Sequence, residues 1–155
     1  MQNSEGILND LLVNLFNDIL RIEENALKRS DVLLDLSVTE VHTLEAIGVK
    51  NARTMSEVAL DLNITVGTLT TAIFKLIKKG YVERRRIEED RRVVMIELTD
   101  KGKLAYDIHE KFHDEMIKET VCGLNKEEEK ILISSLEKLK DFFERKYELM
   151  KLKEK

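Results

Sequence analysis

The chain contains neither proline nor tryptophan, and it has one cysteine among 155 residues. The single Cys122 excludes an intramolecular disulfide; we expect a buried free thiol and assign it no catalytic role. No apolar run approaches the ~20 residues that a membrane-spanning helix needs, and the N-terminus lacks the basic and apolar regions of a signal peptide. We therefore expect a cytoplasmic protein without a membrane partner.

The sequence also lacks the motifs that mark common catalytic sites. It has no glycine-rich phosphate loop, no Gly-x-Ser-x-Gly elbow, and no Cys and His pair at the spacing of a known enzyme family. Adjacent carboxylates occur at Glu23 and Glu24 and at Glu88 and Glu89, a pattern typical of surface charge. The sequence therefore favours a protein that is not an enzyme and that needs no cofactor.

Positive charge is concentrated in the middle of the chain, although the net charge is -4. Residues 1–49 hold 3 Lys or Arg against 9 Asp or Glu, residues 50–103 hold 12 against 8, and residues 104–155 hold 11 against 13. The densest part runs from Lys75 to Arg92 and is suited to neutralising phosphates. A solvated charged face has the same composition, so charge alone leaves both interpretations open.

The spacing of apolar and capping residues predicts mostly helices. Apolar residues recur three and four positions apart over residues 7–22, which predicts a long amphipathic first helix. Capping boxes at residues 37–40 and 54–57 predict the starts of a second and a short third helix. Thr99 and Asn125 are expected to cap the last two helices.

The middle of the chain changes from a helical to a strand pattern. Residues 65–80 predict a fourth helix, joined to the third by a tight turn. Residues 81–87 and 93–98 are rich in β-branched side chains, and the charged stretch between them predicts the tip of a β-hairpin. This order fits a winged helix-turn-helix, so we expect a mainly α protein with a small β-hairpin. A purely structural helical protein would not explain this basic middle segment.

The fourth helix and the hairpin are predicted to contact DNA. Threonine methyls and the Phe74 ring suit thymine methyls, and the helix lacks the Arg and Asn that read G and A most strongly, so we expect an A·T-rich operator. Phe74 is equally compatible with a core position at the helix edge. The predicted DNA-binding residues are Thr68, Thr70, Thr71, Phe74, Lys75, Lys78, Arg84, Arg86, Arg91 and Arg92.

The predicted hairpin tip combines one acid with two adjacent arginines. An arginine at such a tip can enter a minor groove that A·T-rich sequence has narrowed. We expect Asp90 to pair with Arg92 and so to orient the tip, which leaves Arg91 and Arg84 to Arg86 nearer to phosphate. A simple solvated turn would have the same composition.

The sequence EEDRRVVMIELTDKG at residues 88–102 resembles the wing and the following helix start of the MarR family of regulators. The resemblance extends back through NITVGTLTTAIFKLIKKGYVERRRIEEDRR. It implies a winged helix-turn-helix DNA-binding lobe on a helical dimerisation lobe, a homodimer, a palindromic double-stranded operator and a small effector. The implied organisation is N-terminal helices for dimerisation and effector binding at 5–48, the winged helix-turn-helix at 52–98 and C-terminal dimerisation helices at 99–151.

Within this family, the stretches TVGTLTTAI, GYVERRR and EEDRRVV most resemble repressors of bacterial fatty-acid-synthesis genes. That resemblance implies a repressor that responds to acylated acyl carrier protein or a fatty-acyl effector. A MarR-type regulator that senses another small molecule is an alternative. Thr71 and Phe74 depart from the wider family, where Arg or another polar residue is commoner, so the family's base contacts are not carried over to them.

The three histidines form a second candidate group. His109 and His113 lie four residues apart on one face of the fifth helix, a spacing that suits a metal ion. Resemblance to the family's zinc-dependent repressors of metal-uptake genes implies a site of Glu24, His42, His109 and His113. Three histidines without a nearby cysteine more often form a hydrogen-bonded cluster. We therefore assign these four residues to an effector region, predict no metal, and keep a zinc-responsive repressor as the alternative.

Overall fold

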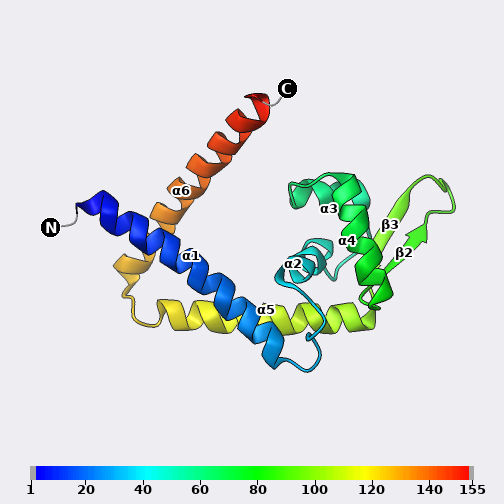
Figure 1. The fold of residues 1–155 in the computed structure, drawn as a ribbon, viewed down its shortest axis with the longest axis horizontal. Coiled ribbons are helices and arrows are strands. Elements are labelled where there is room, and N and C mark those ends of the chain that lie inside the picture. Colours follow the sequence, from blue (N-terminus) through cyan, green and yellow to red (C-terminus); the bar gives the residue numbers. More distant parts are fainter. Residues whose placement is uncertain (1–2, 154–155) are drawn as a thin grey trace. The chain divides into compact units, whose positions relative to one another are not determined.

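The computed structural model describes residues 3–153, which form six helices and three short strands (Figure 1). The elements are α1 (Ser4–Arg29), α2 (Val38–Ile47), β1 (Arg53–Thr54), α3 (Met55–Asp61), α4 (Val66–Lys78), β2 (Val82–Arg86), β3 (Val94–Leu98), α5 (Asp100–Val121) and α6 (Lys126–Lys153). The chain divides into two compact units, Met1–Phe112 and His113–Lys155, and the boundary between them falls within α5. The predicted fold class, mainly α with a small β element, is confirmed.

Helix starts follow directly from capping residues in the sequence. The Ser37 hydroxyl accepts a hydrogen bond from the Glu40 N–H at 3.2 Å, and the Glu40 carboxylate accepts one from the Ser37 N–H at 3.0 Å. Thr54 and Glu57 repeat this exchange before α3, at 3.2 and 2.9 Å. Asn125 caps α6 by accepting a hydrogen bond from the N–H three residues later at 3.0 Å. Each cap satisfies backbone donors that a helix start leaves unpaired.

The third and fourth helices form a helix-turn-helix. The chain bends by 105° between them, within the range of such motifs, and residues 62–65 make the turn. Asn63 has a φ of 54°, a left-handed conformation that asparagine adopts more readily than most residues. Thr65 then caps α4 by accepting a hydrogen bond from the Thr68 N–H at 3.1 Å. The turn thus fixes where α4 begins and the direction in which it runs.

The hairpin belongs to a three-stranded antiparallel sheet with the strand order β1-β3-β2. The two long strands pair from Val82 opposite Leu98 to Arg86 opposite Val94. The strand β1 pairs with the other edge of β3, which makes β3 the central strand. Sequence inspection missed β1, because two residues cannot display the alternation by which strands are recognised.

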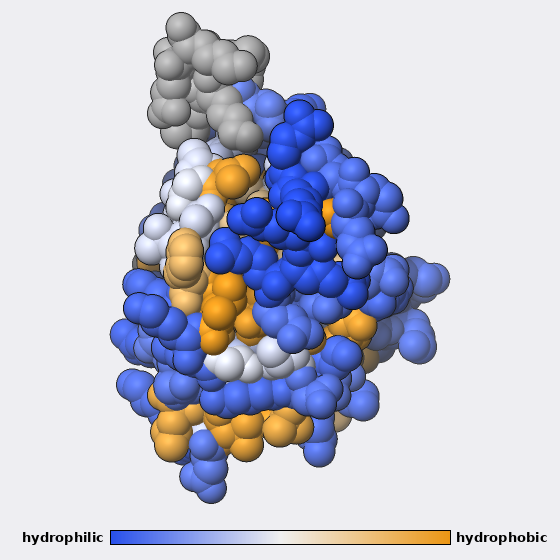
Figure 2. Space-filling view, turned by 90° about the vertical axis from the view of Figure 1, so that its right-hand side faces the viewer, coloured by the Kyte–Doolittle hydropathy of each residue, from blue (hydrophilic) through white to orange (hydrophobic). Residues whose placement is uncertain are grey.

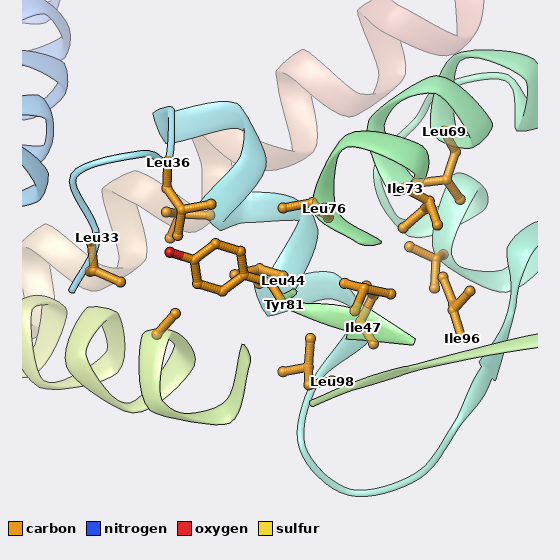
Figure 3. Packing of buried hydrophobic residues seen from close by; sticks show 14 of the residues in the cluster. Leu33, Leu36, Leu44, Ile47, Leu69, Ile73, Leu76, Tyr81, Ile96 and Leu98 are labelled. Carbon is orange, nitrogen blue, oxygen red and sulfur yellow. The ribbon is translucent and has the colours of Figure 1, made fainter. Parts of the chain in front are cut away.

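The Tyr81 side chain lies in the core of the first unit, near Leu33 and Leu44, and is fully buried (Figure 3). Its hydroxyl is 2.5 Å from a carboxylate oxygen of Asp35 and 3.1 Å from the carbonyl oxygen of Val32. Burial, together with the Asp35 carboxylate, raises the pKa of Tyr81 well above its usual value, so the phenol stays a hydrogen-bond donor. Tyr81 therefore ties the loop between α1 and α2 to the base of the hairpin.

The start of α5 packs closely against the backbone at the base of the hairpin. The Thr99 N–H donates to the Tyr81 carbonyl oxygen at 3.0 Å, and the Gly102 N–H donates to the Thr99 hydroxyl at 3.1 Å. A Cβ atom on Gly102 would overlap the Tyr81 carbonyl oxygen and lie 3.2 Å from the Cβ of Leu98. This close approach of helix to backbone therefore requires glycine.

Most apolar side chains of α1 are exposed in the single chain. Only Glu23 and Leu27 of this helix are buried. The exposed apolar residues are Ile7, Leu8, Leu11, Leu12, Val13, Leu15, Phe16, Ile19, Leu20 and Ile22. Across residues 3–153, no single helix is both long and apolar enough to cross a membrane, and only the bent pair of α3 and α4 reaches those limits jointly.

Cys122 lies in the turn after α5 and is exposed. The prediction of a buried thiol was therefore wrong. Free cysteines are usually buried, but this one follows the last helical residue, Val121, where the chain turns at the surface.

Candidate nucleic-acid interface

The helix α4 has one face in the core and another at the surface. Leu69, Ile73 and Leu76 are buried in the core. The spacing of Thr68, Thr71, Lys75 and Lys78 places them together on another face of the helix. Of the DNA-binding residues predicted on this helix, Thr68, Thr71, Phe74, Lys75 and Lys78 are exposed and Thr70 is half-buried. The exposed face thus carries hydroxyl and methyl groups near its start and ammonium groups near its end.

Intrahelical hydrogen bonds orient the threonine side chains of α4. The Thr70 hydroxyl donates to the Val66 carbonyl oxygen at 2.8 Å, and the Thr71 hydroxyl donates to the Gly67 carbonyl oxygen at 3.4 Å. Because these protons are used inside the helix, the two side chains offer a ligand their methyl groups and oxygen lone pairs. Such groups suit contact with thymine methyls and base-edge donors in a major groove.

The lysines at the end of α4 have different roles. The Lys79 ammonium lies 2.8 Å from the Glu40 carboxylate and also donates to the Asp35 carbonyl oxygen. Lys79 therefore stabilises the fold by joining α4 to the start of α2. Lys75 and Lys78 are exposed, which leaves their charges at the surface. The basic stretch seen in the sequence is thus divided between a structural ion pair and a surface patch.

The hairpin tip is organised by an ion pair between Asp90 and Arg92. One carboxylate oxygen of Asp90 accepts hydrogen bonds from the backbone N–H and from the Nε of Arg92, at 3.0 and 3.1 Å. These hydrogen bonds hold the pKa of the Asp90 carboxyl below its usual range. Arg91, between them, is exposed. The side of the molecule that carries the hairpin is largely hydrophilic, with hydrophobic residues in separate patches (Figure 2).

The basic residues of β2 divide between the two faces of the sheet. Arg84 lies over the ring of Phe74, with its Cζ atom 5.3 Å from the ring centroid. Arg85 lies 3.8 Å from the Glu97 carboxylate on β3. Arg86 is exposed at the end of the strand. The hairpin therefore connects to α4 through Arg84, while Arg86 and the tip extend beyond that contact.

A buried cluster of acids and histidines joins α1, α2 and α5 within the first unit. One carboxylate oxygen of Glu23 lies 2.8 Å from the Nε2 of His42 and 2.6 Å from the Nε2 of His109. The Nδ1 of His109 lies 2.5 Å from the Glu45 carboxylate. Glu23 and His109 are 3% and 2% exposed, so these two members are shielded from water, whereas His42 and Glu45 are half-buried.

The cluster favours charged forms of its buried members. Burial works against an ionised Glu23, but hydrogen bonds from His42 and His109 outweigh it and lower the pKa of this carboxyl. Burial likewise works against a charged His109, yet Glu45 and Glu23 raise the pKa of this imidazole above its usual value. Both ring nitrogens of His109 then donate hydrogen bonds. A zinc ion would have to replace at least one of these hydrogen bonds to bind there.

The structure brings together part of the predicted effector group. His42 and His109 meet, but Glu23 joins them and Glu24 is exposed, because consecutive helical residues point about 100° apart. His113 is the first residue of the second unit. Sequence reasoning missed Glu45, which follows His42 by three positions and so shares its side of α2. Glu23 lies one helical turn before Leu27, the other buried residue of α1, but the sequence alone did not reveal that either is buried.

Comparison with known proteins gave one family and several relatives. A model of the MarR family matches residues 36–94. The crystal structure of Streptococcus pneumoniae FabT in complex with DNA is 40% identical, with a TM-score of 0.85, and covers 89% of this chain and 96% of that one. The HTH-type transcriptional regulator BilQ of Clostridium symbiosum is 34% identical over 60% of this chain and 65% of its own length. The regulator PchR of Bacillus subtilis is 26% identical over 66% and 63%. The chain thus spans slightly less than two thirds of these two curated relatives.

Proposed function

Because the chain belongs to the MarR family, we propose that it is a homodimeric, sequence-specific DNA-binding transcription regulator. The observation that carries this proposal is the joint exposure of α4 and of a basic hairpin on one helix-turn-helix unit. A recognition helix of this size enters the major groove, while a wing reaches the neighbouring minor groove. The relatives found are transcription regulators rather than enzymes, and the chain shares that class.

We assign the direct DNA contacts to two groups of side chains. In α4 they are Thr68, Thr70, Thr71, Lys75 and Lys78, and in the hairpin they are Arg86, Arg91 and Arg92, with Asp90 orienting the tip. The threonine methyls favour A·T-rich sequence in the major groove. Two-fold symmetry would present two such units to a palindromic operator, about one helical turn or ~34 Å apart.

Replacement of Lys75 or Arg91 by alanine is expected to weaken DNA binding about tenfold without unfolding the protein. Each change removes one phosphate contact per subunit and two per dimer, so the slope of log affinity against log salt should become shallower by about two. The measurement is a fluorescence titration of the DNA upstream of the protein's own gene, at several salt concentrations.

The matched control for these variants is Lys111→Ala. Lys111 is exposed on α5, so the change removes the same charge outside α4 and the hairpin. Its affinity should stay within about twofold of the wild type. Unchanged affinity in both Lys75→Ala and Arg91→Ala would contradict the assigned interface.

The exposed apolar face of α1 supports the proposed homodimer. Its ten exposed apolar residues form a surface that a monomer rarely leaves open to water. Leu15→Glu is expected to shift the protein from dimer to monomer at micromolar concentration, because it would bury an unpaired charge in the contact. Analytical ultracentrifugation measures the change. Asn17→Glu adds the same charge on the opposite face of α1 and should leave the dimer intact, and a Leu15→Glu dimer of unchanged stability would exclude this contact.

We further propose that the chain represses fatty-acid-synthesis genes and responds to acylated acyl carrier protein. The resemblance of its recognition helix and wing to repressors of that class supports this assignment, as does its 40% identity to FabT. The hydrogen-bonded state of both His109 nitrogens favours this effector over zinc. DNA binding that tightens with long-chain acyl carrier protein and ignores a chelator is the expected result. Loss of binding on chelation, restored by zinc, would support the zinc-responsive alternative instead.

A further inference from the structure

We propose that Phe74 and Arg84 form a clamp that sets the position of the hairpin relative to α4. This inference rests on the proposed DNA-binding function and changes the role of both residues within it. From sequence, each was predicted to contact DNA. In the clamp they are positioning residues, which act on DNA binding through the placement of the wing.

The contact between the two side chains is a cation–π interaction. The Arg84 guanidinium carbon lies 5.3 Å from the centroid of the Phe74 ring, within the ~6 Å over which such pairs attract. The ring itself is 49% exposed, so it is not a core residue of the helix. Stacking orders a long, flexible arginine side chain and directs its charge toward α4.

The register of the sheet explains why Arg84 faces α4. Alternate residues of a strand share a face, so Arg84 lies on the same face as Val82, which is 2% exposed. Its cross-strand partner, Ile96, is also buried. Arg85 lies on the opposite face, beside Glu97. Arg84 thus lies on the same face of the sheet as the apolar residues that pack on α4, and it is a charged residue at the end of that face.

The side chains of the clamp line part of a small, partly open apolar cavity. This cavity of about 150 Å³ is lined by Met55, Thr70, Ile73, Phe74, Ile77, Arg84 and Val94, from α3, α4 and both hairpin strands. Because the space is not filled by side chains, packing holds the hairpin to α4 less firmly here than in the core. Beyond the cavity, toward the hairpin tip, the exposed charged residues are Arg85, Arg86, Glu88, Glu89, Arg91 and Arg92. The Phe74–Arg84 contact therefore lies where the hairpin leaves the body of the unit.

A fixed hairpin matters because two grooves must be engaged together. The position of α4 in a major groove determines where the tip must reach the minor groove. A hairpin that moves freely would lose conformational entropy on binding, and fixing it beforehand avoids that cost. The clamp thus contributes to affinity without adding a phosphate contact.

The test in DNA binding compares Phe74→Leu, Arg84→Gln and the double variant. Each single change should weaken binding to the DNA upstream of the protein's own gene about two- to fivefold, and the double variant no further. Arg85→Gln removes an equal charge from the opposite strand face and is the matched control. Between about 50 and about 200 mM salt, the slope of log affinity against log salt should be the same for Arg84→Gln as for Arg85→Gln. Additive losses, with a slope of log affinity against log salt about two units shallower for Arg84→Gln than for the control, would assign Arg84 of both subunits to phosphate and overturn the clamp.

A second measurement needs no DNA. Hydrogen exchange of the amides at residues 87–93 should be faster in both Phe74→Leu and Arg84→Gln than in the wild type and in Arg85→Gln. Unchanged exchange would overturn the clamp even where DNA binding falls. Failure of the wild type to bind the DNA would instead overturn the proposed function, and with it the contribution of the clamp to affinity.

Discussion

Replacement of Gly102 by alanine is expected to lower the free energy of unfolding by about 3 kcal/mol. The new methyl group would overlap the Tyr81 carbonyl oxygen and press on Leu98, both held by the sheet and the core. Backbone on one side and a buried side chain on the other leave little room for relaxation. The gain of helix propensity from Gly to Ala, about 1 kcal/mol, would offset only part of this loss. Urea unfolding followed by circular dichroism measures the change.

The matched control for this prediction is Gly123→Ala. A Cβ atom on Gly123 would meet nothing within 4 Å beyond its two chain neighbours, so this variant should be as stable as the wild type or slightly more stable. If Gly102→Ala matched the control, the start of α5 would have to be further from the hairpin than the structure places it.

Loss of the Glu23 carboxylate is expected to destabilise the protein by about 3 kcal/mol, with a marked dependence on pH. Glu23→Gln leaves the buried, charged His109 with only the half-buried Glu45 among the carboxylates described beside it. The folded-state pKa of Glu23 is lowered from 4.5, so its contribution is present above pH 4.5 and is lost as pH falls below that value. The folded-state pKa of His109 is raised from 6.5, so its contribution is present below pH 6.5 and is lost as pH rises through the raised pKa.

The stability difference between wild type and Glu23→Gln should therefore be largest between about pH 4.5 and 6.5 and decline on both sides. Urea unfolding at a series of pH values measures this profile. Glu24→Gln removes the neighbouring, exposed carboxylate and should show a nearly flat difference from the wild type. A flat profile for Glu23→Gln as well would show that His109 does not carry its charge in the folded protein.

The parts of the fold that the sequence predicted are those set by local chemistry. Ser37 and Thr54 are each followed by an acid at the third helical position, and both capping boxes form. The change from helical to alternating spacing after Gly80 correctly placed the hairpin. The strand β1 depends on β3, 40 residues later, so no local pattern of its own reveals it.

The candidate site was less accessible from sequence, because its contacts join distant segments. A helical stripe predicts which residues of α4 face outward, yet it cannot show that Lys79 reaches Glu40 or that Arg84 covers Phe74. Glu23 and Glu24 are adjacent on α1, so a rotation of the helix by one residue decides which of the two carboxylates faces His42 and His109. The first helix is apolar over more than one face, since Phe16 and Leu20 flank the main stripe. The pattern therefore did not specify its orientation closely enough to choose.

The strand order has a consequence for how the protein avoids self-association through its sheet. The apolar strand β3 is central, and the outer strand β2 carries Glu83, Arg84, Arg85 and Arg86 in succession. An outer strand presents unpaired backbone groups that can template pairing with another chain, and a dense row of charge discourages it. The other outer strand, β1, is only two residues long. The same arginines that make the hairpin basic thus also protect its open edge against aggregation.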